Sequence, residues 1–397
     1  MTERLYYDNA YLTQFHATML DCFAKDDTYL VLLDRSAFYP TSGGQPYDTG
    51  TLGDARVLDV NVEDGLVWHT VDRPLAKGDT VEGRIDWARR LDHMQQHAGD
   101  HMIAGALHRL MGGVTIGLHI SSDISTIDVA MPEGATRITD AEIRRIEEDV
   151  NEHIRRNVPI RCWFPEEAEL AALPLRKKPT VSEHVRIVAI GDDEMVACGG
   201  THPRNAGELG LVKILSVAPA RGKMRVSFLA GQRAFADYQR CHDAVRTASQ
   251  QLSTTAEGLG ESIAALQERL RNAEITITRM KQDMLFARIP TMLKTAPALP
   301  CGAKLICGFA DADAASLKLL VSRLIQEPRV IALMGAKTGD SAVYVFGRSA
   351  DVDADMGKLL RECAQPLGGK GGGRPDFAQG GGCEEILTRA VAVVEGM

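Results

Sequence analysis

LDHMQQHAGDHMIAGAL occupies residues 91–107 and MVACGGTHPRNAGELG residues 195–210, and each stretch holds side chains at metal-ligand spacing. His97 and His101 are four residues apart, so on a helix they project from one face about one turn apart. The apolar, proline-free residues that follow favour this helix. Between Cys198 and His202, two glycines favour a tight loop, in which a thiolate and an imidazole converge. Three histidines and one cysteine suit zinc better than magnesium or calcium.

The spacing leaves one alternative open. A lone pair of histidines on a helix is more often a solvated face than a ligand pair, and it is the combination of the two stretches that indicates zinc. His93 also lies one turn before His97. Spacing alone therefore does not decide whether His93 or His101 completes the set.

The first 88 residues have an all-β pattern. YLVLLD at residues 29–34 predicts a strand, and Asp64-Gly65 separates two runs rich in valine, which is a strong hairpin signal. We expect a small β-barrel domain at residues 1–88.

Residues 89–231 predict an α/β domain around the two metal-ligand stretches. Thr139 and Glu142 form a capping box before a helix at residues 140–156, whose apolar residues step by three and four. Strands are expected near 114–131, 158–164, 185–190, 211–216 and 224–229, in a sheet around the Cys-Gly-Gly-Thr-His loop.

Residues 232–290 change to heptad spacing. Two apolar repeats, separated by Gly258 and Gly260, predict an antiparallel coiled-coil hairpin. A dimerisation zipper gives the same pattern, and periodicity does not choose between the two.

Residues 291–397 alternate strands and helices, which predicts a C-terminal α/β domain. Residues 368–382, GGKGGGRPDFAQGGG, predict a glycine-rich loop whose backbone approaches phosphate or ribose closely, with Lys370 and Arg374 beside it. The same composition also fits a flexible linker. The fold class expected for the whole chain is α+β: barrel, zinc-containing α/β domain, helical hairpin and C-terminal α/β domain.

Composition describes a globular protein with room for two to four domains. The chain has 397 residues, of which 45% are hydrophobic and 25% charged. Its apolar runs are far shorter than the ~20 residues of a membrane span, and its N-terminus lacks a signal pattern. Eight cysteines without a disulfide framework fit a reducing compartment. We therefore expect a cytoplasmic protein with no membrane partner.

Four motifs in order resemble one known family. The two metal-ligand stretches, FYPTSGGQPYDTG at residues 38–50 and the glycine-rich block resemble the editing and C-terminal domains of alanyl-tRNA synthetases and the free-standing alanyl-tRNA editing proteins, of which the chain looks like a long form. The resemblance implies that zinc is held by His97, His101, Cys198 and His202, with His93 as a neighbour. Because the chain opens within about 40 residues of the Gly-Gly-Gln block, a stand-alone hydrolase is expected.

The resemblance also implies the substrate: tRNA(Ala) mischarged with serine, chiefly, or with glycine. No Gly-x-Ser-x-Gly motif offers a nucleophile, so water is expected to attack the ester. Among the candidate catalytic residues, Thr115 matches a hydroxyl residue that reads serine, although a threonine also simply fills a strand. His119, Asp100 and Gln45 complete the candidates. Asp100 departs from the family pattern, where threonine or glutamine is common.

The net charge of −8 argues against a broad phosphate-binding surface. We therefore expect a small footprint for tRNA, formed by Arg176, Lys177 and Lys178 and by Lys370 with Arg374. Two questions stay open at this stage. Zinc either activates water or only positions the substrate. The chain is either a hydrolase or a tRNA-binding protein with a purely structural zinc. A homodimer through the hairpin or the C-terminal domain is one expected assembly.

Overall fold

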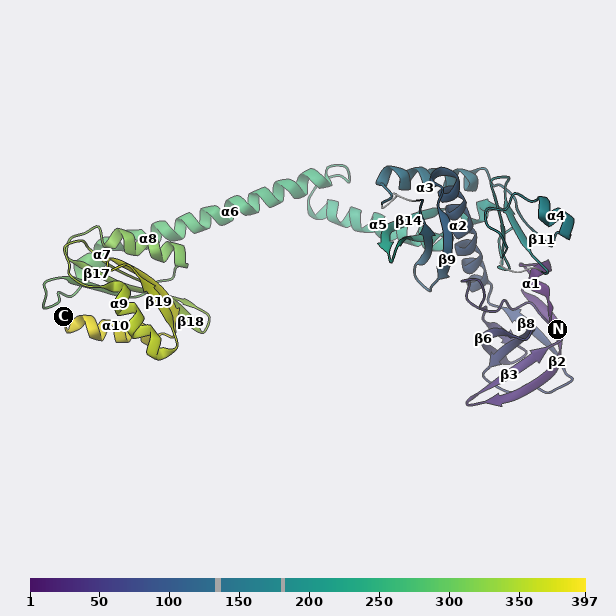
Figure 1. Cartoon of the computed structure of the whole chain (residues 1–397), viewed down its shortest axis with the longest axis horizontal. Coiled ribbons are helices and arrows are strands. Elements are labelled where there is room, and N and C mark those ends of the chain that lie inside the picture. Colours follow the sequence, from purple (N-terminus) through teal and green to yellow (C-terminus); the bar gives the residue numbers. More distant parts are fainter. Residues whose placement is uncertain (133–136, 180–182) are drawn as a thin grey trace. The chain divides into compact units, whose positions relative to one another are not determined.

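The computed structural model describes residues 1–132, 137–179 and 183–397. The chain divides into two compact units, Met1–Thr247 and Ala248–Met397 (Figure 1). The predicted barrel and zinc-containing regions both fall within the first unit. In the described part of the chain, no helix is both long enough and apolar enough to cross a membrane.

The N-terminal part of the first unit is a closed six-stranded barrel in the order β2-β3-β7-β6-β5-β8. Its strands are β2 (Gln14–Lys25), β3 (Thr28–Leu33), β5 (Gly50–Leu52), β6 (Ala55–Glu63), β7 (Leu66–Val71) and β8 (Thr80–Ile85). Asp64 and Gly65 both adopt positive φ between β6 and β7, as a two-residue hairpin turn of this hand requires. Before β2, α1 (Leu5–Asp8) follows β1 (Glu3–Arg4), which pairs in parallel with β4 (Arg35–Ser36).

A buried ion pair joins the barrel to the long helix α2 (Trp87–Met111). Arg90 and Asp48 are both fully buried, and the Arg90 guanidinium also donates to the carbonyls of Ala10 and Ala37. Breaking such a pair from one side costs about 3–5 kcal/mol, because a buried charge is left unpaired. The pair therefore fixes the loop before β5 against the helix that carries the two histidines.

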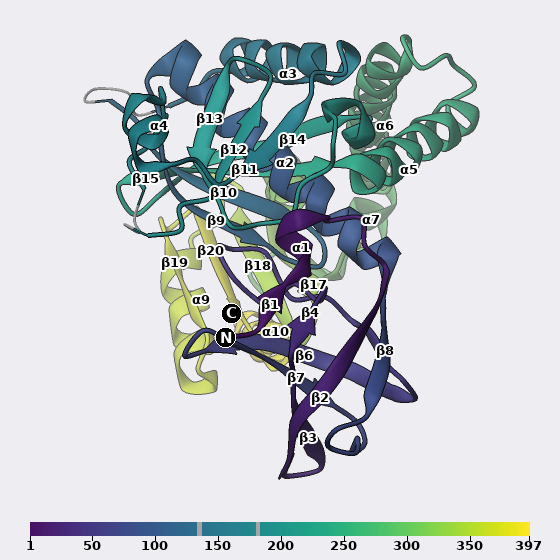
Figure 2. The same cartoon turned by 90° about the vertical axis from the view of Figure 1, so that its right-hand side faces the viewer.

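Helix α2 runs through the core of the first unit, between the barrel and α3 (Asp140–Arg155), as Figure 2 shows. Asp86 caps its start by accepting from the Arg89 backbone N–H, and Gly112 ends it with a φ of 69°. Residues 93–107 are all buried, which explains why the helix lacks a polar face. The capping box of Thr139 and Glu142 predicted for α3 is present.

Two antiparallel sheets, rather than the one sheet expected, surround the metal-ligand stretches. One has the order β14-β15-β10-β9 and the other β11-β12-β13. The first sheet contains β9 (Val114–Ile120), β10 (Ser125–Ala130), β14 (Val212–Ala220) and β15 (Lys223–Ala230). The second contains β11 (Ile160–Trp163), β12 (Ile187–Ile190) and β13 (Glu194–Ala197). The short helices α4 (Glu167–Ala172) and η1 (Ala206–Leu209) complete this region. Strand β13 was not predicted, because it is only four residues long and ends directly before Cys198.

The two heptad repeats form the helices α5 (Gly231–Gln251) and α6 (Leu259–Ala287). The boundary between the two units falls within α5. The coiled-coil pairing of the two helices therefore stays a prediction.

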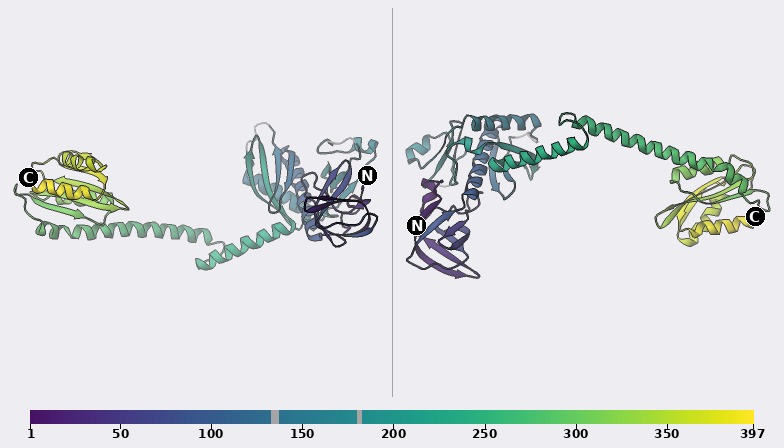
Figure 3. Two further views of the ribbon diagram at one scale, coloured as in Figure 1. Left: turned by 90° about the horizontal axis from the view of Figure 1, so that it is seen from below. Right: turned by 180° about the vertical axis from the view of Figure 1, so that it is seen from behind.

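The second unit contains a five-stranded sheet in the order β16-β17-β18-β20-β19, seen from two sides in Figure 3. Its strands are β16 (Lys304–Phe309), β17 (Val330–Thr338), β18 (Ser341–Arg348), β19 (Lys370–Gly373) and β20 (Phe377–Gly382). The helices are α7 (Ile289–Thr295), α8 (Ala314–Leu324), α9 (Met356–Ala364), η2 (Gln365–Leu367) and α10 (Glu385–Glu395). β16 pairs in parallel with β17, and the other pairs are antiparallel.

The glycine-rich block is not the loop that the sequence predicted. It forms the hairpin of β19 and β20, against which α9 packs. A Cβ on Gly371 would lie 2.8 Å from the Leu360 side chain, and one on Gly357 would lie 2.4 Å from the Gly373 carbonyl oxygen. These glycines allow a helix to approach a strand pair closely, which is a packing role that composition does not distinguish from phosphate binding.

Candidate metal centre

Helix α2 presents His97 and His101 on one face, and both side chains are almost fully buried. The opposing loop, residues 198–202, follows β13. Arg186 holds this loop by donating from Nη1 to the carbonyls of Cys198 (3.0 Å) and Gly200 (2.8 Å). Gly200 faces the His97 ring so closely that a Cβ would lie 2.2 Å from Cε1. The Gly-Gly pair therefore lets the loop reach the helix.

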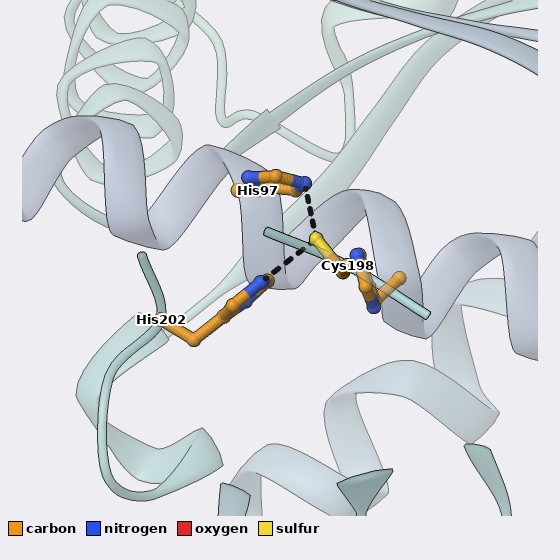
Figure 4. Close-up of side chains that lie close together, drawn as sticks. His97, Cys198 and His202 are labelled. Atoms are coloured by element: carbon orange, nitrogen blue, oxygen red, sulfur yellow. Dashed lines mark hydrogen bonds between the residues drawn. The ribbon is translucent and has the colours of Figure 1, made fainter. Parts of the chain in front are cut away.

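The side chains of His97, His101, Cys198 and His202 form one group, with their ligand atoms within 4.8 Å of one another. Cys198 Sγ lies 3.4 Å from His97 Nε2 and 3.5 Å from His202 Nε2. Figure 4 shows the cysteine between the two imidazoles. A tetrahedral zinc with ordinary bond lengths separates a sulfur and a nitrogen ligand by about 3.6 Å. The donor set and this spacing fit zinc.

Gln45 fixes the orientation of His97. Its Oε1 lies 2.8 Å from His97 Nδ1 and also accepts from the Thr201 backbone N–H, while its Nε2 donates to Thr201 Oγ1. Because Oε1 only accepts, His97 Nδ1 carries the proton and Nε2 is left free for the metal. Gln45 is fully buried, and its side-chain contacts are with His97 and Thr201.

The Gly-Gly-Gln turn rests on strand β9. Gly43 and Gly44 have φ of 57° and 85°, and Ser42 and Gln45 exchange backbone hydrogen bonds across them. A Cβ on Gly44 would lie 2.4 Å from the Leu118 carbonyl oxygen, and the Ile120 N–H donates to the Gly44 carbonyl. The turn therefore ties the barrel, β9 and the metal ligands together.

Burial sets the protonation of the four ligands. It lowers the pKa of His97 to about 3 and those of His101 and His202 well below the ordinary value, so these imidazoles are neutral, the form that binds metal. Burial raises the pKa of the Cys198 thiol to about 12, against the effects of the Gly200 N–H and Arg186. A cation in the group would offset this burial cost and favour the thiolate.

The metal-ligand group opens onto a hollow of about 580 Å³. Asp100 and Thr115 line it with His97 and His101, and Lys177 and Lys178 line it as well. Asp100 is buried, its Oδ1 has no partner among the described residues, and burial raises its pKa to about 7. The hollow thus holds a carboxylate, a hydroxyl and two lysines beside the metal ligands.

Arg176 does not lie on the surface as the sequence predicted. Its side chain is 9% exposed, and its Nε lies 2.8 Å from Oε1 of Glu194, which is 4% exposed. Its Nη1 donates to Thr115 Oγ1 at 2.9 Å. Arg176 is therefore part of the wall of the hollow, and neither Glu194 nor this pairing was found from the sequence.

The structure does not bring His119 to the hollow with Thr115. A bulge at Ile116 shifts the register of β9 on β10, so that Val129 pairs with Thr115 while Asp128 pairs with Gly117. Because one extra residue reverses the facing of a strand, His119 lies on the opposite face from Thr115, and it is exposed. His93 is outside the metal-ligand group and lines a separate hollow with Arg89 and Arg233.

Three regions of the chain match known families. Residues 2–89 match tRNA synthetases class II (A), residues 185–226 the threonyl and alanyl tRNA synthetase second additional domain, and residues 302–397 the DHHA1 domain. The alanine–tRNA ligase of Haloquadratum walsbyi is 32% identical over 418 residues, which cover 100% of this chain and 44% of the ligase. The chain is alanyl-tRNA synthetase-like. This confirms the resemblance that the four motifs indicate.

A further relative and one solved structure are also similar to parts of this chain. The alanine–tRNA ligase of Halobacterium salinarum (strain R1) is 34% identical over 415 residues, which cover 99% of this chain and 44% of the ligase. Among solved structures, the C-Ala domain of Aquifex aeolicus alanyl-tRNA synthetase is 26% identical, covers 25% of this chain and 93% of that domain, and has a TM-score of 0.23. The chain spans less than half the length of the ligases it matches.

Proposed function

We propose that the chain is a trans-editing hydrolase that removes the wrong amino acid, chiefly serine and also glycine, from tRNA(Ala). The observation that carries the proposal is the hollow beside the metal ligands, which Thr115 and Asp100 also line. An ester of an amino acid presents a carbonyl, an ammonium and a side chain to such a hollow. The metal-ligand group, Asp100 and Thr115 match these three in chemistry.

His97, His101, Cys198 and His202 would hold a zinc ion, which supplies positive charge next to the reacting ester. Gln45 keeps the Nε2 of His97 free, and Arg186 keeps the loop of Cys198 against the helix. Asp100 is proposed to accept hydrogen bonds from the substrate ammonium, because its Oδ1 has no partner among the described residues. Water is the proposed nucleophile.

Selectivity is assigned to Thr115. Serine differs from alanine by one hydroxyl, and a site that hydrogen-bonds a hydroxyl rejects the analogue lacking it by about 10⁴-fold in favourable cases. An apolar pocket of the same size discriminates far less. A polar side chain that hydrogen-bonds the serine hydroxyl therefore spares correctly charged alanyl-tRNA better than an apolar pocket does.

For tRNA binding we propose Lys177 and Lys178 at the hollow and Lys370 and Arg374 in the second unit, all of which are exposed. Homodimerisation is proposed to use α6. Apolar side chains with exposed fractions of 43–72% follow its heptads: Ile263, Leu266, Leu270, Ile277, Met280 and Met284. Sedimentation of the Leu266→Lys variant tests this, since a dimer held by α6 would dissociate.

The alternative is a tRNA-binding protein whose zinc is purely structural. Removing zinc with a chelator separates the two functions. If the proposal is right, removal of zinc abolishes hydrolysis of seryl-tRNA(Ala) while the circular dichroism spectrum stays native. Added zinc then restores the rate. A structural zinc would instead give loss of the native spectrum, or an activity that does not depend on the metal.

A further inference from the structure

The wall of the hollow contains a buried ion pair that contacts the candidate selectivity residue. Glu194 is the first residue of β13. Its carboxylate accepts from Arg176 Nε, which lies 2.8 Å from Oε1 and 3.1 Å from Oε2. The Arg176 backbone N–H donates to the Met195 carbonyl at 2.9 Å. Strand β13 therefore holds Arg176 through both its side chain and its backbone.

Stability alone is a weak reason for this pair. Burying two charges costs desolvation free energy that their attraction only partly offsets, and well-packed apolar side chains of the same volume often stabilise a protein as well or better. The Arg176 side chain is 9% exposed and that of Glu194 4% exposed, so both are desolvated. The free end of the pair, Nη1, reaches Thr115 Oγ1 rather than solvent.

This contact fixes the direction of the Thr115 hydroxyl. A guanidinium has five N–H donors and no acceptor, so the Thr115 oxygen must accept from Arg176. The hydroxyl hydrogen of Thr115 then points away from Arg176 and remains available to another acceptor. Lys177 Nζ also lies 3.5 Å from the Thr115 carbonyl oxygen, which holds the backbone of the same residue.

We propose that Arg176, held by Glu194, is a positioning residue that aims the Thr115 hydroxyl into the hollow and so sets the preference for an acyl group that carries a hydroxyl. This rests on the proposed editing function. Arg176 acts through Thr115 and does not touch the substrate. Glu194 has the supporting part, because it restrains the guanidinium in the plane that reaches Thr115.

A double-mutant cycle on the full-length, zinc-loaded protein tests this inference. The measured quantity is the ratio of kcat/KM on seryl-tRNA(Ala) to kcat/KM on alanyl-tRNA(Ala). Arg176→Met and Thr115→Val should each lower the ratio by roughly 3- to 15-fold, as expected for one lost hydrogen bond. In the Thr115→Val background, Arg176→Met should change the ratio by less than about 2-fold, because the group it positions is already gone.

Arg155→Met is the control. Arg155 lies at the end of α3 and pairs with the exposed Glu152, so the variant removes an arginine from the same unit without touching Thr115 or Glu194. The ratio should stay at the wild-type value. Zinc content and the thermal unfolding midpoint are recorded for every variant.

Two results would overturn the inference: an unchanged ratio in Arg176→Met, or the same loss in both backgrounds, which would mean that Arg176 meets the substrate itself. If Arg176→Met does not fold, Arg176→Lys replaces it. The lysine ammonium keeps the positive charge but lacks the planar set of N–H donors of a guanidinium. The ratio of kcat/KM values should therefore fall partly in the wild-type background and should not change in the Thr115→Val background. A wild-type protein that cleaves neither ester would refute the proposed function instead.

Discussion

The metal-ligand group depends on the absence of a side chain at Gly200. The His97 ring occupies the space where any Cβ at position 200 would lie, at 2.2 Å from Cε1 and 2.3 Å from Nδ1. Gly199, its neighbour, has only the Tyr7 hydroxyl at 3.4 Å from the corresponding point. Two adjacent glycines of one motif therefore face very different surroundings.

This difference gives a paired prediction. Gly200→Ala should displace the loop of Cys198 from α2 and lower zinc occupancy to less than half of the wild-type value, whereas Gly199→Ala should keep it. Atomic absorption on both purified variants measures the occupancy. Equal zinc content in the two variants would mean that the loop adapts to an added methyl group and that the close approach is not required.

The register of the metal ligands is a second prediction at this scale. His101 belongs to the metal-ligand group and His93 does not. His101→Ala should therefore lose most of its zinc, and His93→Ala should retain about one zinc per chain. Metal analysis that shows zinc lost from His93→Ala and kept by His101→Ala would reverse this assignment.

At the residue scale, the sequence predicts what depends on local spacing and misses what depends on packing. His97 and His101 are readable because a helical turn is regular, and Cys198 and His202 because glycines mark their loop. The facing of His119 was not readable, since the bulge at Ile116 arises from pairing with β10. Arg176 was mistaken for a surface residue because its partner, Glu194, is 18 positions away.

At the scale of elements, the barrel contains a histidine that couples its stability to pH. His69 on β7 is fully buried, with Nε2 2.7 Å from Ser36 Oγ. Burial lowers its pKa to about 4 from an ordinary 6.5. Between these values the unfolded chain binds a proton that the folded barrel does not. The stabilisation is therefore fully present above pH 6.5 and is lost as the pH falls toward 4.

We predict that the free-energy difference between wild type and His69→Gln depends on pH. It should shrink by about 2 kcal/mol from pH 7.5 to pH 5, since each pH unit below the unfolded pKa costs about 1.4 kcal/mol. Urea unfolding followed by tryptophan fluorescence measures it. His16→Gln, on the outside of the same barrel, is the control. A difference that stays constant over this range would show that folding does not lower the pKa of His69.

Elements were predicted best where a period or a turn signal is local. The Asp64-Gly65 hairpin and the capped helix α3 were foreseen for that reason. The glycine-rich block was expected to be a loop, yet it forms β19 and β20, because glycine is selected there by the approach of α9 and not by chain flexibility. Composition cannot separate these two causes.

At the scale of the whole molecule, the division at Thr247 and Ala248 suggests a separation of tasks. The metal-ligand group and the hollow lie in the first unit, while Lys370 and Arg374 lie in the second. A protein that ends at residue 247 should hydrolyse a seryl ester on a short acceptor mimic at nearly the full-length rate. On complete tRNA its KM should rise.

Steady-state kinetics on the two substrates measures this separation. Full zinc content in the shortened protein is the control for folding of the first unit. If KM on complete tRNA were the same with and without the second unit, that unit would have a purpose other than tRNA binding, such as dimerisation.

The hollow beside the metal ligands is proposed to remove serine from tRNA(Ala) and to spare alanine. The release of labelled amino acid from seryl-tRNA(Ala) and from alanyl-tRNA(Ala), measured in parallel with the zinc-loaded protein, tests this proposal. We predict rapid loss of serine and slow loss of alanine, with both reactions abolished in Cys198→Ala. Equal rates on the two esters, or no release above the rate in buffer, would refute the editing function.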